Sequence, residues 1–259
     1  AKERLLQQAR ADNAALRAEL DLFVDLSFDT ISSVGANGAV IHYKPEAATC
    51  ARVTADALYL CDSGGQYRDG TTDVTRTVHF GTPSAREVRA YTRVLQGHVD
   101  LADAVFPHNT PGAHLDILAR APLYRDGLDY RHGTGHGVGS FLNVHEGPHG
   151  ISFRSTQHGL LPGMVVTDEP GYYEDGAFGV RIENVLEVVR ADDVPNHFAD
   201  TAFYRFEHVT LVPYSRKLTD VALLDARQLA HIRRYHERCV REVAPLLAHD
   251  ERALAWLKR

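Results

Sequence analysis

Apolar residues recur along the chain at two spacings, one typical of helices and one typical of strands. The helical spacing predicts helices over 1–26, 84–106, 114–121 and 225–258. The second of these begins at a capping box, because Ser84 and Glu87 can each satisfy a backbone N–H of the other. Short apolar or β-branched runs predict strands over 39–41, 57–60, 71–78, 164–167, 180–189 and 209–212. The mixture is typical of an α+β fold.

A hairpin is predicted at the turn pair Asp69-Gly70. A strict two-residue turn would place Asp73 opposite Gln66 and away from Asp62. A bulge at Gly64-Gly65 would correct this register, so the spacing leaves both arrangements open.

Composition narrows the class of protein. The chain has 28 Lys+Arg against 34 Asp+Glu, a net charge of −6, and its basic residues are scattered. This pattern argues against a nucleic-acid partner. No apolar run is long enough for a transmembrane helix, which argues against a membrane partner. Cys50, Cys61 and Cys239 lack CxxC spacing, so neither a disulfide framework nor a Cys-rich zinc site is expected and the cytoplasm is the expected location.

Four acidic residues lie in or beside strands that should be largely buried: Asp62, Asp73, Glu169 and Glu183. Each alone is compatible with a carboxylate that faces water at a strand end. Four together favour pairing or metal binding, because carboxylates are rarely buried otherwise. Strand periodicity places Arg181 on the same face as Glu183, where it can hold acidic ligands by charge-assisted hydrogen bonds.

The segment 131–150 is rich in Gly and His and is expected to be a loop or an irregular strand. A phosphate-binding loop is excluded, because no clear strand precedes it and no clear helix follows it. Two interpretations stay open: a glycine turn with incidental histidines, or backbone close to a metal or substrate with an imidazole ligand. The candidate imidazoles that fall beside glycines or strand ends are His42, His132, His136 and His145.

Several ordered motifs together resemble the pita-bread metallopeptidases, and within them the soluble eukaryotic type of Xaa-Pro aminopeptidase. The resemblance extends from about Phe23 to the C-terminus. The motifs that carry it are 62–64 (DSG), 72–77 (TDVTRT), 132–139 (HGTGHGVG), 144–148 (VHEGP), 168–171 (DEPG) and 181–184 (RIEN).

The resemblance implies a pita-bread catalytic domain, with a mainly antiparallel curved sheet flanked by helices. Residues 1–259 would form this single domain, including a helical C-terminal extension at about 222–259. The family's two smaller N-terminal domains are absent from this sequence. An opening without Met, directly in a helical pattern, is more typical of a segment that continues an upstream domain.

The resemblance also implies a dinuclear metal site. Its ligands would be Asp62 on one metal, His136 and Glu169 on the other, and Asp73 and Glu183 bridging the two. The implied catalytic residues are Glu169, His145 and His42, and the implied substrate-binding residues are His42, His132, His145 and Arg181. All five ligands are present, which is typical of an active relative.

Oxygen-rich ligation with one imidazole and no thiolate is consistent with two divalent ions. Mn²⁺ is expected, with Co²⁺, Fe²⁺ and Zn²⁺ as alternatives. The expected reaction is hydrolysis of an N-terminal Xaa-Pro bond by a metal-bridged hydroxide. The expected partner is a peptide with proline at its second position, and the resemblance implies a homodimer for the full-length protein.

Two other functions stay open. A prolidase, which cleaves only Xaa-Pro dipeptides, would share every metal ligand. A pita-bread protein that has lost catalysis could instead bind peptides or proteins, although the intact ligand set argues against this alternative.

Overall fold

The computed structural model describes residues 20–48, 50–154, 157–195, 197–198 and 200–258. Its helices are α2 (Ala85–Ala102), α3 (Asp116–Tyr124), α4 (Ala226–Val243) and α5 (Glu251–Leu257), with 3-10 turns η1 (Gly35–Ala39), η2 (Gly112–His114), η3 (Arg216–Leu218), η4 (Val221–Leu223) and η5 (Ala244–Leu247). Among the described residues, none of these helices is both long and apolar enough to cross a membrane.

The strands of the described residues form two principal antiparallel sheets and three smaller ones. One principal sheet has the order β10 (Val165–Asp168), β13 (Asn184–Arg190), β14 (Phe203–His208) and β7 (Val105–Pro107). The other has the order β2 (Ile31–Val34), β3 (Leu58–Ser63) and β6 (Val74–His79). The smaller sheets pair β1 (Phe23–Leu26), β4 (Gly65–Tyr67) and β5 (Gly70–Thr71); β11 (Gly171–Glu174) and β12 (Phe178–Arg181); and β8 (Gly135–His136) and β9 (Gly150–Ile151).

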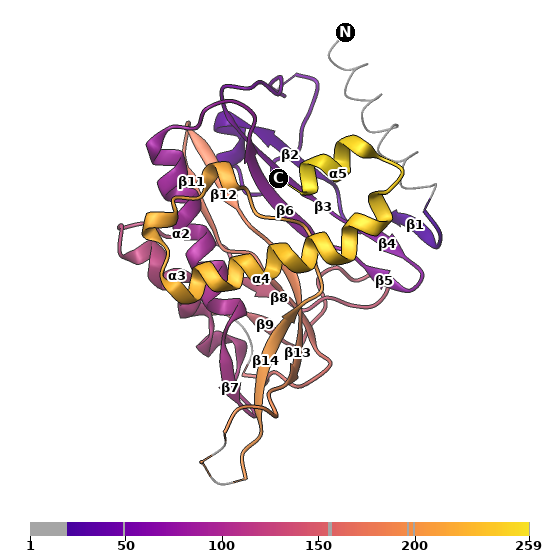
Figure 1. Cartoon of the computed structure of the whole chain (residues 1–259), viewed down its shortest axis with the longest axis vertical. Helices are drawn as coiled ribbons and strands as arrows, with labels where there is room; N and C mark the ends of the chain where they lie inside the picture. Colours follow the sequence, from indigo (N-terminus) through magenta and orange to yellow (C-terminus); the bar gives the residue numbers. More distant parts are fainter. Residues whose placement is uncertain (1–19, 49, 155–156, 196, 199, 259) are drawn as a thin grey trace.

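Two apolar cores hold helices against strands. Figure 1 shows α2 and α3 on one side of the molecule and α4 running across the strands. In one core, Tyr91 and Leu95 of α2 pack with Val180 of β12 and Ile232 of α4. In the other, the end of α2 and α3 pack against β10, β13, β14 and β7. The α+β expectation is therefore confirmed, with helices placed outside antiparallel sheets.

The two helices α2 and α3 approach closely at Gly97. A Cβ atom at this position would lie 2.0 Å from the carbonyl oxygen of Ala119. Glycine is required here because a side chain would not fit between the helices, and not because the backbone adopts a conformation that favours glycine. The capping box predicted at Ser84 and Glu87 is present at the start of α2.

Hairpin register differs from the strict prediction. Tyr67 pairs with Gly70, so the turn residues are Arg68 and Asp69. Asp62 pairs with Thr75, and this register continues without a bulge between the β4–β5 and β3–β6 segments. Asp73 therefore lies two residues from the partner of Asp62, and strand alternation places both aspartates on one face.

Four other expectations are wrong in detail. The predicted strand 39–41 is the end of the 3-10 turn η1 and the turn after it, and the predicted strand 209–212 lies beyond the end of β14. The predicted strand 180–189 is two strands, because the chain leaves β12 at Arg181 and enters β13 at Asn184. Residues 23–26 of the predicted first helix form β1, where Phe23 packs edge-on against Tyr67 of the paired strand β4. Residues 1–19 of that helix lie outside the described part of the chain.

The predicted strand 71–78 is also two strands, β5 and β6, with a break at 72–73, and the other elements agree closely with the sequence pattern. The helices predicted at 84–106, 114–121 and 225–258 are α2, α3 and the series α4, η5 and α5. Helix α2 ends earlier than predicted, since β7 begins at Val105 and pairs with β14. The Gly- and His-rich segment contains only the short strands β8 and β9, as an irregular strand would.

Candidate metal centre

A single cavity of about 630 Å³ contains every residue that the sequence nominated for the site. Its walls include the carboxylates of Asp62, Asp73, Glu169 and Glu183, the imidazoles of His42, His132, His136 and His145, and the guanidinium of Arg181. These residues come from segments more than one hundred positions apart in the chain. The fold therefore brings the sequence candidates together in one place.

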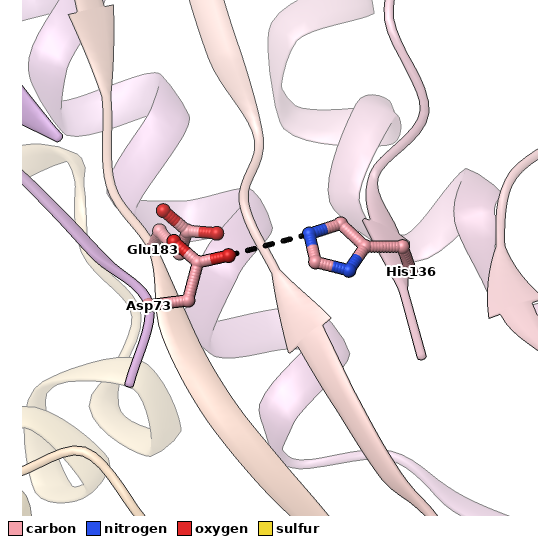
Figure 2. Close-up of side chains that lie close together, drawn as sticks. All are labelled: Asp73, His136 and Glu183. Carbon is pink, nitrogen blue, oxygen red and sulfur yellow. Dashed lines mark ion pairs between the residues drawn. The ribbon is translucent and has the colours of Figure 1, made fainter. Parts of the chain in front are cut away.

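Asp73, His136 and Glu183 form the tightest group within the cavity. One ligand atom from each lies within 4.8 Å of the others. Figure 2 shows the three side chains pointing toward one another. His136 Nε2 is 3.4 Å from Asp73 Oδ2 and 3.5 Å from Glu169 Oε1. Two carboxylates and one imidazole at these separations can converge on one divalent ion, and Glu169 lies on the same side of the imidazole.

Asp62 lines the same cavity and is held by Arg181. Arg181 Nη2 donates to Asp62 Oδ2 over 2.8 Å. Asp62 Oδ1 is buried and has no hydrogen-bond partner among the described residues. A buried carboxylate oxygen without a partner is costly unless it has another ligand. The residues present thus fit a metal site with free oxygen donors.

Burial of several carboxylates close together raises their pKa values. Burial raises the pKa of Glu169 to about 7. It also raises the pKa of Glu183 well above its ordinary value, with further contributions from Asp73 and Asp62. Burial likewise raises the pKa of Asp62, although Arg181 opposes this change. These shifts identify a site that favours added positive charge.

The two nearby imidazoles respond in opposite directions. Burial lowers the pKa of His136, but its hydrogen bond to Asp73 and the charge of Glu169 outweigh burial, so the net change is upward. The pKa of His145 is lowered by burial and by His136. The His145 and His136 rings are 4.1 Å apart between centroids and meet edge to face. His145 is therefore a neutral imidazole next to the acidic group.

Arg181 and His132 are oriented by a chain of hydrogen bonds in which each donor and each acceptor can be assigned. Arg181 Nη1 donates to the Tyr173 hydroxyl over 2.8 Å, and that hydroxyl is 2.8 Å from His132 Nε2. His132 Nδ1 is 2.7 Å from the carbonyl oxygen of Gly133, which can only accept. Burial lowers the pKa of His132 to about 4, so its single proton is on Nδ1 and Nε2 accepts from Tyr173. Both ring nitrogens of His132 are thus used within the protein.

Two residues with clear positioning roles were not singled out from the sequence. Thr75 Oγ1 donates to Glu183 Oε2 over 2.6 Å and accepts from Arg181 Nε over 3.2 Å. Its place two residues after Asp73 on the same strand face could have indicated it. Tyr173 carried no such indication, because its contact with His132 depends on a long-range fold.

Comparison with known proteins agrees with this geometry. The model of metallopeptidase family M24 matches residues 2–190, and the C-terminal region of that family matches residues 202–259. The chain belongs to metallopeptidase family M24.

Individual relatives that are similar to this chain indicate which subfamily it resembles. The chain is 56% identical to a probable Xaa-Pro aminopeptidase P of Coprinopsis cinerea and 57% identical to aminopeptidase P1 of Lotus japonicus, in each case over 94% of this chain. It spans 39% and 37% of the lengths of these two relatives. A crystal structure of X-prolyl aminopeptidase from Caenorhabditis elegans, a cytosolic enzyme with a di-nuclear active site, matches with a TM-score of 0.89 at 43% identity, covering 94% of this chain and 40% of that one. The expected family and fold are therefore confirmed.

Proposed function

We propose that this chain is the catalytic part of a dinuclear metallo-aminopeptidase that releases the N-terminal residue from peptides with proline at the second position. The observation that carries the proposal is the cavity that unites Asp73, His136 and Glu183 with Asp62 and Glu169. The names of the relatives favour an aminopeptidase over a prolidase.

The proposed ligands are Asp62 on one ion, His136 and Glu169 on the other, and Asp73 and Glu183 between them. Two divalent ions held in this way would polarise the scissile carbonyl and lower the pKa of a water molecule. We propose Mn²⁺, with Co²⁺, Fe²⁺ and Zn²⁺ as alternatives, because the donors are oxygen-rich and include no thiolate.

The remaining proposed roles are those that the family resemblance implies, and the position of each side chain in the cavity is compatible with them. Glu169 takes a proton from the attacking water and delivers it to the prolyl nitrogen as the C–N bond breaks, which yields a free amino acid and a peptide that begins with proline. His145 donates a hydrogen bond to the oxyanion of the tetrahedral intermediate. His42 and His132 line the part of the cavity that receives the substrate's proline. His132 contacts the proline through its ring, because both of its nitrogens are hydrogen-bonded within the protein. Arg181 holds Asp62 in place.

The broader assignments belong to the same proposal. We propose that residues 1–259 act as one catalytic domain with a helical C-terminal extension, that the full-length protein is a homodimer, and that it acts in the cytoplasm. The last assignment is supported by the similarity to a cytosolic enzyme.

Metal content and release of the N-terminal residue from an Xaa-Pro-Xaa peptide, with and without added Mn²⁺, test this function. We expect about two ions per chain and Mn²⁺-stimulated release. Asp73→Ala should abolish release, while Asp56→Ala, a change at an exposed aspartate, should not. Full activity of Asp73→Ala would refute the assigned site. Activity on an Xaa-Pro dipeptide but not on the tripeptide would indicate a prolidase, and bound metal without turnover would indicate a binding protein.

A further inference from the structure

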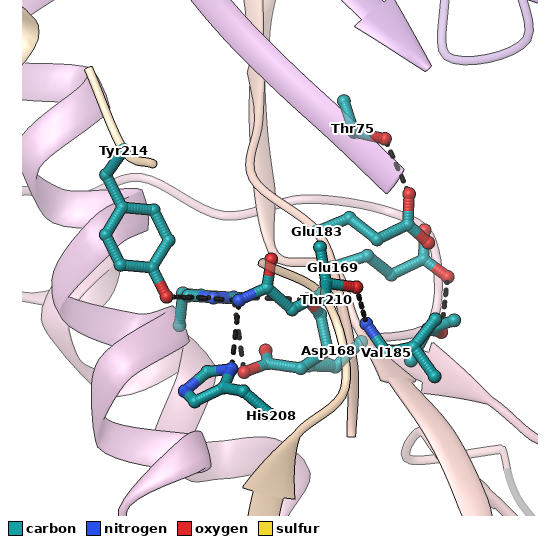
Figure 3. Close-up of polar contacts among 12 residues, drawn as sticks. Thr75, Asp168, Glu169, Glu183, Val185, His208, Thr210 and Tyr214 are labelled. Carbon is teal, nitrogen blue, oxygen red and sulfur yellow. Dashed lines mark hydrogen bonds and ion pairs between the residues drawn. The ribbon is translucent and has the colours of Figure 1, made fainter. Parts of the chain in front are cut away.

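A buried histidine of α2, His98, contacts Asp168, the residue that precedes the proposed ligand Glu169. His98, Asp168 and Asn184 are each 0% exposed, and Tyr214 is 3% exposed. Figure 3 shows Asp168 next to His208, with Tyr214 on one side and the Glu169 and Glu183 side chains on the other. None of these four buried side chains lines the cavity itself.

Two of these residues form a cross-strand pair that sets the position of two proposed ligands. Asp168 at the end of β10 pairs with Asn184 at the start of β13. Glu169 follows Asp168 and Glu183 precedes Asn184, so each proposed ligand is one residue beyond the pair. Any change in the separation or twist of the pair is therefore transmitted to both carboxylates.

His98 and Tyr214 bridge this pair from the side of α2. His98 Nδ1 is 3.1 Å from the carbonyl oxygen of Asp168, and His98 Nε2 is 3.0 Å from the Tyr214 hydroxyl. Asn184 Nδ2 donates to the Tyr214 hydroxyl over 3.2 Å and to His208 Nδ1 over 2.9 Å. The bridge thus runs from the backbone of one strand to the side chain of the other.

The direction of every bond in the bridge is fixed. The carbonyl of Asp168 can only accept, so His98 carries its proton on Nδ1. Burial lowers the pKa of His98 well below its ordinary value, so Nε2 is an acceptor and the Tyr214 hydroxyl donates to it. That hydroxyl then accepts from Asn184. Because the Tyr214 hydroxyl accepts from Asn184 and donates to His98, its deletion breaks both halves of this bridge, although Asn184 Nδ2 also lies 3.2 Å from the Tyr235 hydroxyl.

Arg76 fixes the other side of Asn184. Its Nη2 donates to Asn184 Oδ1 over 2.6 Å, and its Nη1 donates to the carbonyl oxygen of Glu183 over 2.6 Å. The Asn184 amide therefore cannot rotate to replace a lost partner without breaking its bond to Arg76.

We propose that His98 and Tyr214 are positioning residues of the metal centre, which hold the Asp168–Asn184 pair and thereby the relative placement of the Glu169 and Glu183 carboxylates. This inference rests on the proposed function, since it assigns both glutamates as ligands. Residues that orient metal ligands from behind commonly affect affinity by about 10–100-fold when they are changed.

Tyr214→Phe in the 259-residue chain tests the proposal, because it removes only the bridging hydroxyl. Tyr204→Phe is a matched control: Tyr204 is also buried and its hydroxyl also contacts a histidine, with 2.8 Å to His108 Nδ1, but it packs in the core away from the cavity. Mn²⁺ binding isotherms, thermal unfolding without metal, and kcat and KM on Xaa-Pro-Xaa are measured for wild type and both variants.

We expect Tyr214→Phe to weaken Mn²⁺ binding by about 10-fold or more and to shift the Mn²⁺ dependence of kcat to higher concentration, with little change in KM. Tyr204→Phe should lower thermal stability alone. His98→Gln, which breaks the same bridge at its other half, should behave as Tyr214→Phe and replaces it if that variant does not fold. Wild-type Mn²⁺ affinity in either folded variant would overturn the inference. A wild-type chain that binds no Mn²⁺ would instead overturn the proposed function.

Discussion

Replacing Glu169 with glutamine should make the metal-free protein more stable at high pH, and the size of the effect follows from the site. The Glu169 side chain is 19% exposed, and burial raises its pKa from 4.5 to about 7. A pKa shift of this size corresponds to about 3 kcal/mol in the free energy of unfolding.

The sign follows from proton uptake. Below pH 4.5, Glu169 is protonated in both the folded and the unfolded chain and contributes no pH dependence. As the pH rises to about 7, the unfolded chain loses this proton first, so the free energy of unfolding falls. Glutamine carries no titrating proton. The stability of Glu169→Gln relative to wild type should therefore rise by about 3 kcal/mol between pH 4.5 and pH 8.

Urea unfolding in EDTA across this pH range measures the difference. Glu237→Gln, which changes an exposed glutamate of α4, is the control and should give a flat difference. Mn²⁺ should reverse the order of wild type and Glu169→Gln, because a ligand at 100 times its Kd adds about 2.7 kcal/mol per site to the protein that binds it. A pH-independent difference for Glu169→Gln in EDTA would refute the electrostatic reasoning.

Three further predictions follow from the geometry. Thr75→Val, which keeps the side-chain volume, should weaken Mn²⁺ binding about 10-fold by isothermal titration, because Glu183 loses the hydroxyl that orients it. Gly97→Ala should lower the free energy of unfolding by about 1–3 kcal/mol in urea, owing to its clash with Ala119, whereas Gly70→Ala, which has open space, should show no clash. Mn²⁺ binding near pH 6 should release protons, seen as a dependence of the binding enthalpy on the buffer, because the carboxyl groups with raised pKa values must ionise; an enthalpy independent of the buffer would contradict it.

The sequence predicted helices and strands well where local interactions determine them. The α2 capping box and its amphipathic face are local, so Ser84 and the helix that follows were correctly placed. The strand expected at 209–212 failed because β-branched residues alone do not determine pairing, and here the sheet is completed by β14 and β7.

The residues nominated from the sequence line one cavity, but their mutual geometry was not predictable. Burial of a carboxylate can be inferred from a strand pattern, which is how Asp62 and Asp73 were found. Their separation depended on the hairpin register. The one-residue shift of the turn places Asp73 two residues, and not four, from the partner of Asp62. The contacts of His98 and Tyr173 connect segments that no local pattern relates, so only the folded chain brings them out.

The proposed carboxylate ligands come from the two principal sheets or the residues next to their strands, and His136 comes from the small strand β8. Asp62 and Asp73 belong to the hairpin of β3 and β6, whereas Glu169 and Glu183 flank β10 and β13. Without metal, the hydrogen bonds that join the two regions here include Glu183 N to the carbonyl oxygen of Thr75 over 3.1 Å. Bound ions would make the opening of either sheet depend on the opening of the other. Slow amide hydrogen exchange in β3, β6, β10 and β13 should then share one free energy of opening with metal, and separate into two without it.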